Sequence, residues 1–469
     1  MKSLHFILQL LFALCCFNSI IFAFPHQFEN AKVLRVIDIN NAIAREEVGI
    51  RARNVDNKVA QDYYFYLPSF VAQKSATISA FLKKEKTPLK LDFYKLDEQS
   101  DLNVYKIHLD KPVQPQQDVL IGIKIAYTHL IKPMPAKLPQ VARQHTSFAF
   151  NTYLISPYTT KETKTTLQTP SKNIISHTGG QGKTTVNNNK IVYGPYTNIS
   201  PMSFDLATCH FENTKPLLTV TSLKRDIEVS HWSQNLAVEE HYALRNDGAQ
   251  LEQSFSRIQY QMSSHIHDQT NVLKGLSFDL PVSARDVYFR DEVGNVSTSH
   301  FRVQNDKALL EIQPRYPLFG GWNYTWYHGY NADLASYVHS DKGKYMLKVN
   351  FVENVKNMVI DKATVRVILP EGSSHIKVTT PFDVDSESTT FYFTYFDSTG
   401  RTMVVLEKNN VIKDHELPIL IEYEYTTSRL LQKPLVTSFA IFLLFVISII
   451  IGKMSFTIGK EEKSALKKE

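Results

Sequence analysis

Four short segments combine residue types that could do chemistry. Residues 177–184 (HTGGQGKT) end like a phosphate-binding loop, in which glycine-rich backbone leads into Lys183 and Thr184. That loop needs a glycine where His177 stands, a strand before it and a helix after it, and the flanking sequence predicts neither element. We therefore expect a flexible loop here, not a nucleotide site.

The other three segments carry possible metal ligands. The two aspartates of residues 383–385 (DVD) resemble the pairs with which some enzymes hold a metal–phosphate group, but one such pair arises by chance in 469 residues. The histidines of residues 265–268 (HIHD) lack a third ligand within reach in the sequence. Residues 415–416 (HE) lack the second histidine of a zinc-peptidase helix, which Pro418 would break. We expect no metal, no cofactor and no catalytic residue.

Two apolar runs predict how the chain meets a membrane. Residues 435–452 form an uncharged run of 18 residues, about 27 Å of helix, which is enough for a transmembrane span. Residues 1–23 have Lys2 near the start, then an apolar stretch ending at Ala23, and this predicts a cleaved signal peptide, with an uncleaved anchor as the alternative. The tail, residues 454–469, is rich in lysine. We therefore expect a cytosolic tail and a lumenal body, as in a type I membrane protein.

The composition describes the lumenal body as globular. Hydrophobic residues make up 43% of the chain and charged residues 21%. The formal net charge of +6 falls to about +3 once Lys2 and the tail are set aside, which indicates no nucleic-acid binding. Cys209 is the single cysteine outside the predicted signal peptide, so we expect a small buried residue and no internal disulfide.

Alternating apolar residues predict a mainly β body built as sandwiches. The alternation is clear in residues 119–127, 345–351, 363–369 and 421–425. Residues 391–406 are typical of a hairpin with its turn at residues 397–400. Residues 161–189 are rich in threonine, serine, asparagine, glycine and lysine, and we expect a surface loop there.

A weak internal repeat predicts two similar domains. Asn54 and Asn246 end similar strand pairs 192 positions apart, and the preceding Arg53 and Arg245 align with them. Chance similarity of two strand pairs is the alternative. The predicted organisation is a signal peptide at 1–23, two β-sandwich-like lumenal domains at 24–215 and 216–433, a transmembrane helix at 434–453 and a cytosolic tail at 454–469.

Three Asn-x-Ser/Thr sites fall in the predicted lumenal body, at Asn198, Asn295 and Asn323. In a translocated chain such asparagines are glycan acceptors, and we expect them at the surface. Pro201 directly follows the first site and makes it the least favoured of the three. We expect a glycoprotein.

Three further segments make the chain recognisable. They are residues 193–196 (YGPY) with 210–213 (HFEN), residues 223–232 (LKRDIEVSHW) with 238–240 (VEE), and residues 314–331 (PRYPLFGGWNYTWYHGYN). Their order and spacing resemble the ribophorin I family, a subunit of the oligosaccharyltransferase of the endoplasmic reticulum. The resemblance covers nearly the whole lumenal body and the single C-terminal span, and the brief tail is similar to the fungal form. We expect the glycine–aromatic motif at residues 320–331 to serve the fold or an interface.

The resemblance implies an accessory subunit, not an enzyme. The complex transfers a preassembled glycan from dolichyl diphosphate to asparagine in nascent chains, and its catalytic subunit carries a Trp-Trp-Asp motif. Here Trp232, Trp322 and Trp326 are never paired and never precede aspartate. The expected partners are the catalytic and other subunits in the endoplasmic reticulum membrane, with the nascent polypeptide and the translocon nearby. The expected role is to support the catalytic subunit and acceptor presentation.

Other functions remain open at this point. A lumenal cargo receptor or chaperone-like binding module would have the same topology, but it would need an export or retrieval signal in the tail. A lumenal enzyme, such as a metallopeptidase relative, would need a set of metal ligands. If the span belongs to a membrane complex, Thr437, Ser438 and Ser448 are candidate contacts with a neighbouring helix, because small residues let helices approach closely.

Overall fold

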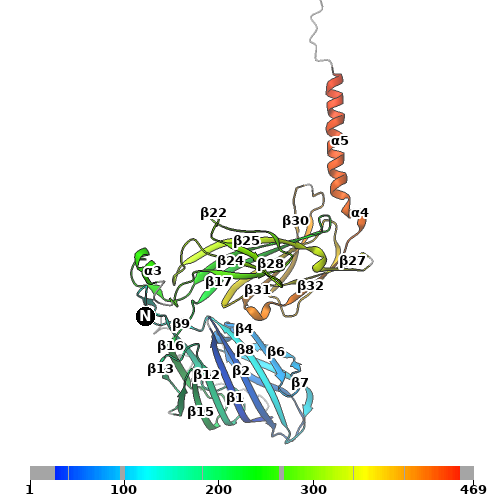
Figure 1. Cartoon of the computed structure of the whole chain (residues 1–469). Coiled ribbons are helices and arrows are strands. Elements are labelled where there is room, and N and C mark those ends of the chain that lie inside the picture. The colour runs from blue at the N-terminus through cyan, green and yellow to red at the C-terminus, as the bar shows by residue number, and fades with distance from the viewer. Residues whose placement is uncertain are drawn as a thin grey trace, which may run out of the picture.

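The computed structural model describes residues 27–40, 42–95, 101–181, 183–263, 269–341, 343–395 and 397–454. Strands dominate, and one long helix, α5 (Gln432–Lys453), lies at the end of the described chain. Figure 1 shows two β-rich halves, with α5 leaving the second half on the side away from the first. The predicted mainly β fold with one apolar C-terminal helix is confirmed. The predicted signal peptide, and the predicted tail beyond residue 454, lie outside the described residues.

Three sheets form the N-terminal half. The main sheet has the order β14 (Thr184–Asn187), β15 (Lys190–Ile199), β12 (Thr160–Gln168), β1 (Phe28–Asn40), β2 (Ile43–Asn54), β8 (Asp118–Thr128), β4 (Ser75–Leu82) and β5 (Pro88–Leu89). The second has the order β13 (Ile174–Thr178), β16 (Leu206–Glu212), β11 (His145–Asn151) and β9 (Lys132–Pro133). The third has the order β3 (Ala60–Pro68), β7 (Leu102–Val113) and β6 (Leu91–Lys95).

Three sheets also form the C-terminal half. The main sheet has the order β30 (Ser386–Tyr392), β31 (Arg401–Val411), β28 (Met358–Ile368), β17 (Leu218–Ser230), β18 (Asn235–Asn246), β25 (Asn323–Asp333), β21 (Arg285–Asp291) and β22 (Gly294–Asn295). The second has the order β29 (Ser374–Thr379), β32 (Pro418–Glu424), β27 (Lys344–Asn350) and β26 (Val338–Asp341). The third has the order β20 (Leu276–Leu280), β24 (Ala308–Ile312) and β23 (His300–Val303).

The two halves match strand for strand in order and direction. In each main sheet one neighbouring pair is parallel, β1 with β12 and β17 with β28, while the other pairs are antiparallel. A β-bulge lies at the same place in both copies, between Asn30 and Lys32 and between Val220 and Ser222. The weak repeat in the sequence is therefore the trace of a duplicated β unit.

The aligned asparagines make the same contacts in both copies. Both Asn54 and Asn246 are fully buried. The Asn54 side-chain amide donates to the carbonyls of Lys58 and Val113, at 2.8 and 2.9 Å, and its Oδ1 accepts from the backbone N–H two residues on. Asn246 likewise donates to two carbonyls, both at 3.0 Å, and accepts from the N–H two residues on. Each asparagine thus fixes the chain as it leaves the second strand of its copy.

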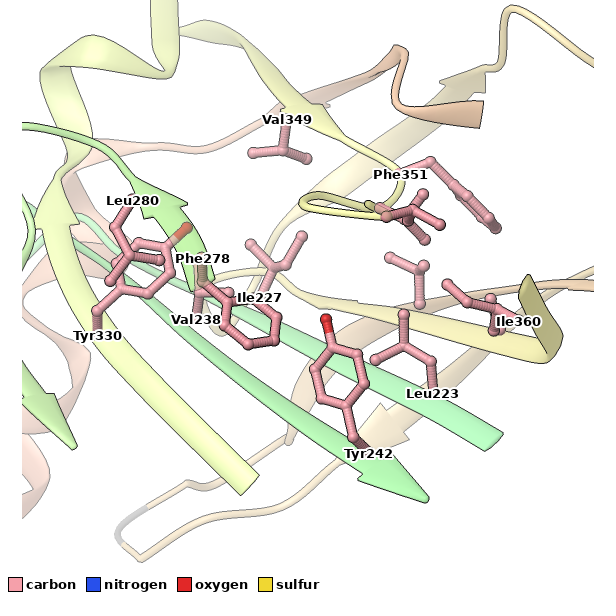
Figure 2. Close-up of a cluster of buried hydrophobic side chains, with 14 of the residues drawn as sticks. Leu223, Ile227, Val238, Tyr242, Phe278, Leu280, Tyr330, Val349, Phe351 and Ile360 are labelled. Atoms are coloured by element: carbon pink, nitrogen blue, oxygen red, sulfur yellow. The ribbon is translucent and has the colours of Figure 1, made fainter. Parts of the chain in front are cut away.

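Each half encloses its own hydrophobic core. One cluster of buried side chains draws on residues 28–217 and adds only Val359 from beyond them, and the other draws on residues 218–425. Burial alternates along the whole of β18, so that Val238 and Tyr242 face the second core. Figure 2 shows these two side chains among other core residues, including Phe278 of β20 and Phe351, which directly follows β27. The period-two alternation in the sequence arises because such a strand packs one face against the core and leaves the other face more exposed.

The strand predictions hold where apolar residues alternate and fail where the strand is polar. The four predicted rows fall on β8, β27, β28 and β32, and the last three rows extend one residue beyond their strands. The predicted hairpin is β30–β31. The surface loop predicted for residues 161–189 is wrong, because these residues include most of β12 and all of β13 and β14. Thr163 and Thr165 of β12 are buried, and threonine favours strands because it is β-branched.

Several polar contacts join the two halves. A short strand from each half forms a parallel pair, β10 (Lys137–Leu138) with β19 (Gln250–Leu251). The Gln144 side chain accepts from the Ala249 backbone N–H at 2.9 Å. Arg45 donates two hydrogen bonds to Asp414, at 2.6 and 3.0 Å. The remaining elements are short: α2 (Ser69–Ala72), α3 (Arg257–Ser263), α4 (Thr427–Leu430) and the 3-10 turns η2 (Leu334–Ser336) and η3 (Lys413–His415).

Candidate functional site

The segments with possible metal ligands are engaged in structural contacts. The Asp385 carboxylate accepts hydrogen bonds from the backbone N–H and the side-chain amide of Asn409, at 2.8 and 2.7 Å. His415 is buried, and its Nδ1 accepts from the Ile412 N–H at 3.1 Å. Burial lowers the pKa of His415 to about 4, so its imidazole is neutral near pH 7. Residues 265–268 lie outside the described residues.

The phosphate-loop-like segment joins two strands. Its first two residues, His177 and Thr178, end β13, and Thr184 begins β14. A strand therefore follows where a phosphate loop needs the N-terminus of a helix. The Gly180 N–H donates to Asp205 at 3.1 Å, so this backbone donor has a partner within the protein.

The glycine–aromatic motif at residues 320–331 packs into the core of the second half. A Cβ on Gly320 would lie 2.1 Å from the carbonyl oxygen of Ala249, so only glycine lets the two backbones approach this closely. The Trp326 ring is 3% exposed and stacks on Tyr242, with ring centroids 4.8 Å apart. Of the two interpretations of the motif, fold and interface, these contacts favour the fold.

A buried ion pair and a cavity lie together in the first half. Arg35 Nε donates to Glu46 at 2.7 Å, and the Tyr127 hydroxyl donates to the same carboxylate at 3.0 Å. These three residues belong to the lining of a cavity of about 710 Å³, whose other lining residues are mostly apolar and include Phe148 and Phe204. Its volume lies in the range of pockets that hold small ligands. The lining suits an apolar group.

The second half has a larger buried charge cluster in the corresponding place. Arg225 is 2% exposed and pairs with Glu240 and, at 3.1 Å, with Glu353. The Tyr242 hydroxyl donates to Glu240 at 3.0 Å, and His328 lies 3.2 Å from the same carboxylate. Burial opposes ionisation of Glu240, but the charge of Arg225 and the contacts with Arg225 and His328 together outweigh it and lower the pKa of this carboxyl to about 2. The cluster links side chains of β17, β18 and β25, and each member has a structural partner.

Cys209 is a buried core residue of β16. Its side chain is 0% exposed, and it contributes to the core of the first half. Burial raises the pKa of its thiol to about 12, so the thiolate needed for nucleophilic attack does not form near pH 7. The small buried residue expected from the sequence is what the structure contains.

The three glycan-acceptor asparagines are all exposed. Asn198 lies in β15 with a positive φ of 55°, Asn295 ends β22, and Asn323 begins β25. The side-chain oxygen of Asn295 accepts a hydrogen bond from Arg290 Nε at 2.8 Å. No two of them share a hairpin, so the structure presents three separate positions and no single site.

The predicted contacts in α5 lie on two faces. This helix is long and apolar enough to cross a membrane, and none of its residues is buried. Thr437 and Ser448 are eleven residues apart, three helical turns, and so lie on one face, whereas Ser438 lies on another. The Thr437 hydroxyl donates to the Lys433 carbonyl at 3.0 Å, within the same helix. Thr437 and Ser448 can therefore meet one neighbour together, and Ser438 cannot join them.

Sequence reasoning missed the two buried arginines. Arg35 stands in phase with Val33 and Ile37, and Arg225 stands in phase with Leu223 and Ile227. A charged residue in step with an apolar row indicates a buried, paired charge, because charge is rarely buried alone.

Comparisons with known proteins give one consistent family. A family model described as Ribophorin I matches residues 28–452. A Caenorhabditis elegans protein named dolichyl-diphosphooligosaccharide–protein glycosyltransferase subunit 1 is 34% identical over 455 residues, 97% of this chain and 77% of the relative. Subunit 1B from Arabidopsis thaliana is 33% identical over 90% of this chain and 92% of its own length. An M1 zinc metallopeptidase structure from Deinococcus radiodurans aligns with 44% of this chain and 42% of its own, at 12% identity and a TM-score of 0.27, too low to argue a shared fold.

Proposed function

The chain belongs to the ribophorin I family, and we propose that it is subunit 1 of the oligosaccharyltransferase complex. That complex transfers a preassembled glycan from dolichyl diphosphate to the asparagine of Asn-x-Ser/Thr in nascent proteins. The observation that carries the proposal is the extent of the family match, which takes in both β halves and nearly all of α5. The Caenorhabditis elegans and Arabidopsis thaliana relatives named as this subunit align with 97% and 90% of the chain.

Within the complex the chain supports catalysis and does not perform it. The groups that could do chemistry are held by backbone hydrogen bonds, as Asp385 and His415 are, or are buried and protonated, as Cys209 is. The duplicated β body offers a large lumenal surface for the catalytic subunit and for acceptor chains. Both the support of the catalytic subunit and the presentation of acceptors are part of the proposal.

The proposed placement is the endoplasmic reticulum membrane, with α5 as the single span and the β body in the lumen near the translocon. The length and apolar character of α5 support the span. The proposed lumenal domains are residues 24–215 and 216–433, which agree with two separate cores that divide between residues 217 and 218.

Endoglycosidase treatment is expected to increase the electrophoretic mobility of the protein. Asn295→Gln and Asn323→Gln should each remove one step of that shift, because both asparagines are exposed acceptors. Asn198→Gln should have the smallest effect, since Pro201 follows its site. Asn57→Gln, at an exposed asparagine outside any acceptor motif, is the control. An unshifted band would contradict a glycosylated lumenal body.

A changed helix face is expected to weaken assembly. Thr437→Leu together with Ser448→Leu keeps α5 apolar but fills the face on which a neighbouring helix would pack closely. Co-purification of the other subunits should fall several-fold. Ser438→Leu, on the other face, is the matched control. Equal recovery of the complex with both variants would mean that α5 only anchors the chain.

One experiment tests the proposed function. The tagged protein is purified in mild detergent, its co-purifying proteins are identified, and the preparation is assayed for transfer of a lipid-linked glycan to an Asn-x-Thr peptide. We expect a stable complex of several subunits with transferase activity. A lone monomer, combined with unchanged glycosylation after depletion of the protein, would refute the proposal and favour a cargo receptor or chaperone-like module.

A further inference from the structure

The hairpin β30–β31 ends in a group of exposed aromatic rings. We name residues 391–395 and 397–400 the juxtamembrane loop. Within it, Phe391 is 66% exposed, Phe393 65% and Tyr395 92%. Large apolar rings are normally buried in such a body, and a local group of exposed ones marks a surface that something else covers.

Polar contacts inside the loop hold its shape. Asp397 accepts hydrogen bonds from both the backbone N–H and the hydroxyl of Thr394, each at 2.7 Å. The Glu371 carboxylate accepts from the backbone N–H groups and the hydroxyls of Ser398 and Thr399, at 2.6 to 3.0 Å. The exposed rings therefore stand on a loop whose turn is fixed by its own hydrogen bonds.

The loop is also fastened to the first turn of α5. Lys433 Nζ lies 2.5 Å from Asp397 Oδ1, and the Asp397 side chain is 0% exposed. The neighbouring Gln432 side chain donates to the Ser398 hydroxyl. Figure 1 shows the end of the β30 hairpin rising beside the start of α5. Because the loop is tied to the point where the helix leaves the body, any bilayer that α5 crosses begins at the level of these rings.

The duplicated half provides an internal comparison. The counterpart hairpin, β14–β15, occupies the corresponding edge of the main sheet in the first half. Its turn consists of Asn188 and Asn189, with no aromatic residue. No long helix adjoins that hairpin in the described residues. Among the described residues, exposed aromatic rings therefore lie at the tip of the hairpin beside the helix and not at the tip of its counterpart.

We propose that the juxtamembrane loop inserts its rings into the lumenal headgroup region of the bilayer and forms a second membrane contact beside α5. Phenylalanine and tyrosine suit that region, where an apolar ring meets lipid chains and a hydroxyl meets water. Two contacts, a helix and a fixed loop, would set the tilt of the β body on the membrane. The inference rests on α5 being a membrane span and not on membership of the complex, so the two can fail separately.

Site-directed spin labelling tests this placement. Tyr395→Cys carries a nitroxide at the most exposed ring, and Val186→Cys carries the control label on the counterpart hairpin, where Val186 is 47% exposed. Cys209 is fully buried and stays unlabelled in the folded chain, which the unsubstituted protein verifies. The chain from residue 24 onward, which lacks Cys15 and Cys16, is placed in phosphatidylcholine nanodiscs. Collisions of each nitroxide with oxygen, which concentrates in lipid, and with a water-soluble nickel chelate are then compared.

We expect the ratio of oxygen to chelate collisions to be several-fold higher at position 395 than at position 186. Equal ratios would place the loop in water and overturn the proposal. If both reagents are excluded at 395 in the purified complex, the rings are covered by a protein partner, and the proposal also fails. Tyr395 is almost fully exposed, so its replacement leaves the core untouched. The folded state of the C-terminal half, which contains position 395, is checked by its tryptophan fluorescence, since Trp232, Trp322 and Trp326 all lie there.

Discussion

Replacing Arg225 by alanine is expected to lower the free energy of unfolding of the C-terminal half by about 3–5 kcal/mol, because removal of one partner leaves a buried charge without compensation. Arg225 neutralises Glu240 and Glu353, and both Arg225 and Glu240 are nearly inaccessible to solvent. Trp232, Trp322 and Trp326 all lie in this half, so the thermal transition of tryptophan fluorescence in the detergent-solubilised chain reports on it. Reaction of the Cys209 thiol with a labelling reagent reports on unfolding of the N-terminal half, because Cys209 is buried in its core.

The matched control is Arg302→Ala. Arg302 also pairs with a glutamate, Glu311, but the two side chains are 61% and 40% exposed. An exposed pair of this kind contributes less than about 1 kcal/mol. The fluorescence transition should therefore move much further for Arg225→Ala than for the control, while Cys209 stays protected in both until the first half unfolds. Equal shifts for the two variants would show that the buried cluster does not stabilise this half.

The same cluster predicts a dependence on pH. Glu240 has a folded pKa of about 2, against an ordinary value of 4.5. Its ionised form therefore stabilises the folded state fully above about pH 4.5, and this contribution is lost as the pH falls toward 2. Without Arg225 the folded carboxyl loses its main partner. The difference in melting temperature between Arg225→Ala and the unsubstituted chain should be smaller at pH 3 than at pH 7, and a constant difference would contradict this assignment.

Gly320→Ala is expected to cost about 3 kcal/mol, at the upper end of overpacking effects, since the obstacle is backbone and not a flexible side chain. The new Cβ would lie 2.1 Å from the Ala249 oxygen and 2.5 Å from that of Gly248. Those residues also meet Gln144 of the first half. The substitution should therefore lower the midpoint of the tryptophan transition and loosen the contact between the halves.

Gly275→Ala is the control for this substitution. A Cβ there meets the Ile312 oxygen at 3.3 Å, a contact that a shift of a few tenths of an ångström relieves. Thermal unfolding followed by tryptophan fluorescence should separate the two variants clearly. Should Gly320→Ala melt like Gly275→Ala, the two segments would not be as closely packed as the structure has them.

The sequence predicted those strands in which apolar and polar residues alternate. The apolar rows in β27 and β32 are detectable in the sequence because each strand packs one face on a core. β12 was missed because its inward positions hold Thr163 and Thr165, which composition alone assigns to a loop. The duplication was detectable from Asn54 and Asn246, but its extent depends on pairings such as that of β1 with β12, which local sequence does not contain.

For the candidate sites, too, local sequence motifs could be interpreted from the sequence, whereas contacts between distant residues could not. Motif spacing disfavoured a nucleotide site at residues 177–184 and a zinc site at residues 415–416, because each segment lacks a residue that such a motif requires. The hairpin at residues 391–406 was predicted, but its aromatic residues look like an ordinary strand until Asp397 is seen against Lys433, 36 positions further on. Burial of Arg35 and Arg225 is likewise decided by strands that only the folded chain brings together.

The parallel ladder in each half has a consequence for the order of folding. Asn30 pairs with Thr160, 130 positions away, so neither copy closes its main sheet until most of it has been synthesised. Such high contact order makes folding slow. All ladders of the first copy except β10–β19 lie within residues 28–212, so that copy can complete its sheets while the second is still on the ribosome. Because of the duplication, the two halves can fold one after the other, each over about half the chain length. The pairing of β10 with β19 then joins the two folded halves.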